Sequence, residues 1–107
     1  MNLPLIDDEL RKSLPTFRSI ENDSNPMVYA KYHHAGEDWT WWAIAFDGRD
    51  AFFGLVLGFD CELGHFSLSE LHQFGVQHGD RVQRDGTFTL CRLRDLFPIT
   101  RVVPRPA

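Results

Sequence analysis

The feature that most constrains this chain is a pair of apolar runs, residues 39–46 and 51–59, separated by the polar segment Asp47-Gly48-Arg49-Asp50. Both runs have the aromatic and aliphatic content typical of strands. The connector contains Asp and Gly, which suit a tight turn. A third apolar run over residues 27–34 precedes them, so the sequence predicts three antiparallel strands joined in chain order.

Side-chain alternation predicts how the second hairpin is paired. A loop with an even number of residues places Trp42 opposite Leu55. It also places Ile44 opposite Phe53, and Phe46 opposite Ala51. The face so formed is expected to hold the main core, with Trp42, Ile44, Phe46, Phe53, Leu55, Leu57 and Phe59. On the other face, Trp41 lies opposite Val56 and Trp39 opposite Gly58.

A short helix is predicted before the strands. Ile6, Leu10 and Leu14 recur every four residues, and Asp7 or Asp8 is placed to cap the first turn. Pro15 ends the pattern. The polar residues 18–26 are expected to form a connecting loop.

A second helix is predicted after the strands. Ser67 and Glu70 have the spacing of a capping box, and Gly75 is expected to end the helix. Residues 87–90 suggest a further strand, residues 92–97 a final helical turn, and the prolines of residues 98–107 an extended tail.

These elements predict an α+β fold. We expect a mostly antiparallel sheet of four or five strands, with two or three short helices packed mainly on one face. A chain of 107 residues supports one hydrophobic core, so residues 1–107 are expected to form a single domain.

The charge distribution bears on the partners. Residues 1–70 carry 12 acids and 5 bases, and residues 71–107 carry 3 acids and 6 bases, which leaves a net charge of −4. Direct nucleic-acid binding is not expected, because it needs a clustered basic surface. The sequence shows neither a membrane-spanning apolar run nor a signal peptide, so we expect a cytoplasmic protein.

Several local motifs resemble one known family. They are Trp39-Thr40-Trp41, Phe46-Asp47-Gly48, Phe52-Phe53-Gly54-Leu55-Val56, Gly58-Phe59, Glu62-Leu63-Gly64 and Phe66-Ser67-Leu68-Ser69-Glu70-Leu71. With them the chain resembles the domain of unknown function 2958 family, small proteins often encoded on plasmids and other mobile elements. The resemblance implies an accessory protein of mobile DNA. It also implies a setting in which such proteins inhibit host defences, of the restriction or CRISPR type, by binding an enzyme.

The residues suited to such binding are aromatic and acidic. Trp39 and Trp41 are the predicted anchors of a protein interface, and Asp47, Asp50 and Glu62 are its predicted charges. Two alternatives stay open for the tryptophans. A helix, such as that over residues 7–14, covers them as part of the core, or their face forms the interface of a homodimer.

A catalytic alternative rests on Asp60, Cys61, Glu62 and His65. Their carboxylates, thiol and imidazole would serve a small hydrolase or a nucleic-acid-modifying enzyme if they converged in a cleft. Zinc ligands could come from Cys61, His65, His72 and Cys91, but no paired C-x-x-C is present. We therefore predict no metal and no cofactor.

Overall fold

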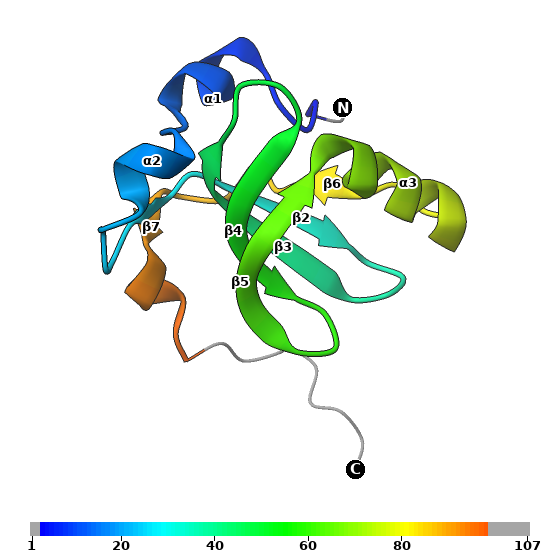
Figure 1. Ribbon diagram of the computed structural model, residues 1–107. Coiled ribbons are helices and arrows are strands. Elements are labelled where there is room, and N and C mark those ends of the chain that lie inside the picture. Colours follow the sequence, from blue (N-terminus) through cyan, green and yellow to red (C-terminus); the bar gives the residue numbers. More distant parts are fainter. Residues whose placement is uncertain (1–2, 99–107) are drawn as a thin grey trace.

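The computed structural model describes residues 3–98 and contains two sheets and three α-helices (Figure 1). Five antiparallel strands form the main sheet in the order β5-β4-β3-β2-β6, and β1 pairs with β7 in a second sheet. The strands are β1 (Met27–Val28), β2 (Ala30–His34), β3 (Trp39–Phe46), β4 (Ala51–Leu57), β5 (Cys61–Ser67), β6 (Gln83–Arg84) and β7 (Cys91–Arg92). The helices are α1 (Asp8–Ser13), α2 (Phe17–Ile20), α3 (Leu68–His78) and the 3₁₀ helix η1 (Leu93–Leu96). The α+β prediction is confirmed, and the predicted tail lies outside the described residues apart from Pro98.

The predicted three-strand meander is present as β2, β3 and β4, and β5 extends it by one more hairpin. The sequence did not reveal β5. Its residues Cys61, Glu62, Leu63 and His65 are all exposed, because β5 lies at the edge of the sheet. A strand with little buried surface lacks the apolar alternation by which strands are recognised.

A β-bulge divides the pairing of β3 with β4. From Thr40 opposite Leu57 to Ala43 opposite Gly54 the register is the predicted one. Beyond this point the register shifts, so that Ala45 lies opposite Phe53 and Phe46 opposite Phe52. The predicted partners of Ile44 and Phe46 are therefore wrong, because Ile44 is an extra residue in the ladder.

The two faces of the sheet hold two cores, and the larger one is not on the predicted face. It lies on the Trp41 face and contains Tyr32, Phe52 and Phe66, together with Phe46, which the bulge moves to this side. The smaller core, on the Trp42 face, contains Val28, Trp42, Ile44 and Leu55. The core on the Trp41 face is the larger one because two helices pack their apolar stripes on this face.

Helices α1 and α3 supply those stripes. Leu10 and Leu14 of the α1 segment and Leu71 of α3 are buried in the larger core, with Phe74 packed against it. Figure 1 shows α1 and α3 at separate places around the sheet. The smaller core is closed instead by residues from α2, β7 and η1, namely Ile20, Cys91, Leu93 and Leu96.

The helix boundaries follow local capping. Asp7 caps α1, and its carboxylate accepts from the Leu10 N–H at 2.9 Å. Ser67 caps α3 as predicted, accepting from the Glu70 N–H at 3.0 Å. The prediction that Gly75 ends this helix is wrong, because Gly79 ends it in the left-handed region at φ 87°.

Gly75 instead lies inside α3 and is buried. A Cβ there would be 3.0 Å from the Asp80 carbonyl oxygen and 3.1 Å from the Arg81 Cα. The glycine thus lets the segment after α3 pack closely on the helix. Two further predictions differ from the structure: residues 18–20 of the predicted loop belong to α2, and residues 87–90 form no strand.

Substitution of Gly54 tests the close approach of β4 to β3. A Cβ at Gly54 would overlap the carbonyl oxygen of Trp42 on the neighbouring strand. We expect Gly54→Ala to lower the free energy of unfolding by about 3 kcal/mol, because the sheet backbone cannot move away cheaply. Chemical denaturation measures this difference.

Gly64 provides the matched control, because it lies directly opposite Gly54 on β5. A Cβ at Gly64 would have no atom within 4 Å. Gly64→Ala should therefore change the free energy of unfolding by no more than about 1 kcal/mol. Equal effects of the two substitutions would contradict the close approach at Gly54.

Candidate functional site

The two predicted aromatic anchors differ in their exposure. Trp41 is only 4% exposed and packs edge-on against Phe74 of α3, with ring centroids 5.2 Å apart. Trp41 belongs to the larger core, because α3 covers this face of the sheet, so its ring offers little exposed area to a partner. Trp39 is only partly buried.

The carboxylates of the two aspartates predicted for the interface, Asp47 and Asp50, accept hydrogen bonds from nearby groups of the protein. The Asp47 carboxylate accepts from the backbone N–H groups of Arg49, Asp50 and Ala51 at 2.7, 2.9 and 3.1 Å. The Asp50 carboxylate accepts from the Ser69 N–H at 3.1 Å and from its hydroxyl at 2.8 Å. Asp47 thus shapes the β3–β4 turn, and Asp50 joins this turn to the start of α3.

Glu62 lies away from both aspartates. It is exposed on β5 near the β4–β5 turn, at the opposite end of β4 from Asp47 and Asp50. The length of β4, seven residues at about 3.3 Å each, separates these two ends. The five predicted interface residues therefore do not form one surface.

A different aromatic feature stands at the Glu62 end. Phe59, in the β4–β5 turn, is 94% exposed, and its ring lies edge-on to Trp39 at 5.5 Å between centroids. Trp39 in turn packs on Phe74 at 5.4 Å. The prediction that Phe59 belongs to the core is wrong, because β4 ends at Leu57 and Phe59 lies in the turn. The Gly58-Phe59-Asp60 sequence was the signal for this turn.

Four acidic residues lie close in the chain to Trp39 and Phe59. The β2–β3 turn carries Glu37 and Asp38, and the β4–β5 hairpin carries Asp60 and Glu62. From Tyr32 to Asp80 the sequence has eight acids and a single Lys or Arg, which is Arg49 at the other end of β4. We name Trp39, Phe59, Glu37, Asp38, Asp60 and Glu62 the hairpin end.

The hairpin end is held to α3 by histidines. His34 is fully buried, and its Nδ1 accepts from the Glu37 N–H at 3.0 Å. Its ring packs on Phe74 and His78 at centroid distances of 5.0 and 5.9 Å. The Glu37 carboxylate lies 3.9 Å from His78 Nδ1. The β2–β3 turn is thereby fixed in place.

The predicted catalytic cluster does not converge. Glu62 lies opposite Val56, on the Trp41 face, whereas Cys61 and His65 are on the other face because strand side chains alternate. The His65 ring packs edge-on to Phe17 and Phe53, at 5.2 and 5.3 Å. Within residues 3–98, no three His, Cys, Asp or Glu side chains are grouped so as to hold a metal ion.

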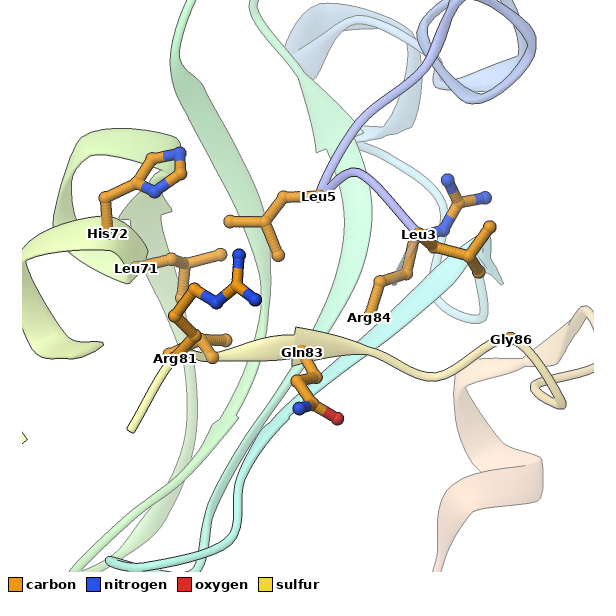
Figure 2. Close-up of a pocket in the computed structure, with 9 residues that line it drawn as sticks. Leu3, Leu5, Leu71, His72, Arg81, Gln83, Arg84 and Gly86 are labelled. Carbon is orange, nitrogen blue, oxygen red and sulfur yellow. The ribbon is translucent and has the colours of Figure 1, made fainter. Parts of the chain in front are cut away.

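A pocket of about 280 Å³ lies elsewhere, between α3 and β6 (Figure 2). It is lined by the amino-terminal residues Leu3 and Leu5, by α3, and by the segment from Arg81 to Gly86. It contains none of the predicted catalytic or interface residues. Sequence reasoning did not predict it, because its walls come from three segments far apart in the chain.

Asp47 makes the stability of the fold dependent on pH. The Arg49 N–H, and then those of Asp50 and Ala51, hold the pKa of the Asp47 carboxyl below its usual value. A lowered pKa in the folded state stabilises the protein above the unfolded pKa of about 4, and this stabilisation is lost as the pH falls through the folded pKa. We expect acidification below about pH 4 to lower the thermal midpoint of the wild type more than that of Asp47→Asn.

The asparagine is a suitable replacement because its amide oxygen still accepts hydrogen bonds but does not titrate. Asp7 and Asp85 also have lowered pKa values, mainly through the Leu10 N–H and the Thr87 hydroxyl respectively, so part of the acid sensitivity should remain. Glu9→Gln, on the surface of α1, serves as the control and should follow the wild type. If Asp47→Asn also follows the wild type, the assigned role of Asp47 is incorrect.

None of the helices within residues 3–98 has the length and apolar content needed to cross a membrane. No curated protein and no solved structure matches the chain. A family model described as protein of unknown function (DUF2958) matches residues 5–97. Because this match covers most of the sequence, including all the strands and helices described above, the chain belongs to the DUF2958 family.

Proposed function

We propose that this protein binds a protein partner through the hairpin end. The observation that carries the proposal is Phe59, whose ring is 94% exposed although it rests against Trp39. An exposed aromatic side chain has few rotatable bonds to fix on binding and a large apolar area to bury. Such residues are typical anchors of protein interfaces.

The charges around Phe59 indicate the kind of partner. Four acids lie at the hairpin end, and among Tyr32 to Asp80 only Arg49, at the far end of β4, is a permanent cation. A basic partner surface complements this potential, and it is attracted over a distance of about 8 Å at physiological salt. The partner is therefore a protein with a basic surface that includes an apolar pocket for the Phe59 ring.

Enzymes that act on nucleic acids have such surfaces, because they neutralise phosphates with Lys and Arg. We propose that the chain is an accessory protein of a mobile element and inhibits a host defence enzyme of the restriction or CRISPR type. It would act in the cytoplasm by occupying the basic cleft in place of the nucleic acid. The family resemblance and the acidic hairpin end support this proposal.

Substitution of Phe59 tests the binding surface. Phe59→Ser should leave the thermal midpoint nearly unchanged, because the side chain is almost fully exposed. Recovery of a specific partner from host lysate, measured by quantitative mass spectrometry, should fall by roughly tenfold or more. The double variant Asp60→Asn/Glu62→Gln should lose binding mainly at low salt.

Val76→Ser is the matched control, because Val76 is 76% exposed but lies on α3 outside the hairpin end. It should recover the partner as the wild type does. The proposed surface is incorrect if Phe59→Ser and Val76→Ser recover the same proteins in the same amounts.

The inhibitory role has a separate test in cells. A restricting host that expresses the wild-type chain should accept unmodified plasmid DNA more efficiently than a host that expresses Phe59→Ser, because only the wild type blocks the enzyme. Transformation efficiency measures this, and a modified plasmid controls for uptake. A host whose only defence is CRISPR, challenged with a targeted plasmid, provides the second arm. No protection by the wild type in either arm would contradict counter-defence, while binding through Phe59 would remain a separate result.

A further inference from the structure

The pocket between α3 and β6 combines an apolar floor with a cation. It lies at the β6 edge of the main sheet, whereas the hairpin end includes part of β5 at the other edge. Leu71 and Val82, which are 1% and 7% exposed, belong to the larger core, and Leu5 packs against it. These three side chains give the pocket an apolar surface that water solvates poorly.

Two arginines line this pocket, Arg84 and the exposed Arg81. Figure 2 shows the Arg81 side chain extending toward Leu5 and Leu71, with the His72 ring on the same side, whereas Gln83 points away. Within residues 3–98, the Arg81 guanidinium has no ion-pair or hydrogen-bond partner. Its donors are therefore available to a ligand.

The carboxylates near the pocket are engaged or directed elsewhere. Asp7 lies 3.1 Å from Arg84 and also accepts from the Leu10 N–H. The Asp80 carboxylate, next to Arg81 in sequence, is directed toward the β2–β3 turn, 3.3 Å from the position of a Cβ on Gly36. Arg84 is thus neutralised while Arg81 is not.

We propose that this pocket binds a small organic monocarboxylate with a short aliphatic chain. The carboxylate pairs with the Arg81 guanidinium, whose planar fork matches it with two hydrogen bonds. The His72 ring supplies a further polar contact. The aliphatic chain lies on Leu5, Leu71 and Val82, where it replaces water.

The charge and the size of the pocket select this class of ligand. The unpaired Arg81 guanidinium can balance one negative charge. A phosphate dianion carries two, and its second charge would remain unmatched on a chain of net charge −4. A volume of about 280 Å³ lies just below the usual range for ligand pockets, which begins at about 300 Å³. A larger amphipathic anion, such as a lipid, would not be enclosed.

Titration of the full-length chain with four matched compounds tests the proposal, with backbone amide NMR signals as the readout. Hexanoate carries both the head group and the chain, acetate the head group alone, hexanol a chain with no charge, and hexylamine the opposite charge. Hexanoate should shift the signals of Leu71, His72 and residues 81–86 saturably, and should raise the thermal midpoint. The other three compounds should bind at least roughly tenfold more weakly.

Arg81→Gln should weaken hexanoate binding by about tenfold or more, because a charged hydrogen-bonded pair is lost. Arg81→Lys keeps the positive charge but not the planar fork of the guanidinium. Its affinity for hexanoate should lie between those of the wild type and Arg81→Gln. Arg49→Gln, in the β3–β4 turn, is the matched control and should bind as the wild type does. Arg81 has no structural partner within residues 3–98, so these variants should keep the wild-type thermal midpoint without ligand.

Three outcomes would overturn the proposal: no saturable shift with hexanoate, equal binding of hexylamine, or equal binding by Arg81→Gln and Arg49→Gln. Neither Phe59 nor any other residue of the hairpin end lines this pocket. Failure here therefore leaves partner binding untouched, and the reverse also holds.

Discussion

The packing of α3 on the Trp41 face of the sheet determines both surfaces proposed for function. Leu68, Leu71 and Phe74 are the side chains of this helix that pack in the larger core, and full burial of a side chain such as Leu71 contributes roughly 2 kcal/mol. Phe74 supports Trp39, and Trp39 supports the exposed ring of Phe59. Leu71 and His72 of the same helix form one wall of the pocket. Loss of α3 would therefore remove both surfaces together.

Much of the main sheet was predictable from local patterns. Alternation and capping chemistry predict the bounds of β3, a cap of α1 at Asp7 or Asp8, the start of α3 at Ser67 and the pairing of Trp42 with Leu55. Each of these depends on residues close together in the sequence or on one regular hairpin. The α+β class follows from them.

The features that were not predicted depend on contacts between distant segments. Whether the Trp41 or the Trp42 face has the larger core is decided by where α1 and α3 pack, and alternation treats the two faces alike. The edge strand β5 has too little buried surface to show a pattern. Gly75 is a residue type that often ends helices, but here it allows the segment after α3 to pack closely on the helix. For the candidate site, the sequence did not show which aromatic rings are exposed: Trp41 is buried, whereas Phe59, expected in the core, is exposed.

The bulge at Ile44 also determines how β3 tolerates a change in length. A single-residue deletion in a regular strand inverts every side chain beyond it, so buried residues become exposed. Deletion of Ile44 would instead make the ladder regular, because Ala43, Ala45 and Phe46 already lie opposite the consecutive residues Gly54, Phe53 and Phe52. The cost would be confined to the Ile44 side chain in the smaller core. Position 44 is thus the one place in the β3–β4 pair where the strand can lose a residue without turning the following side chains to the opposite face.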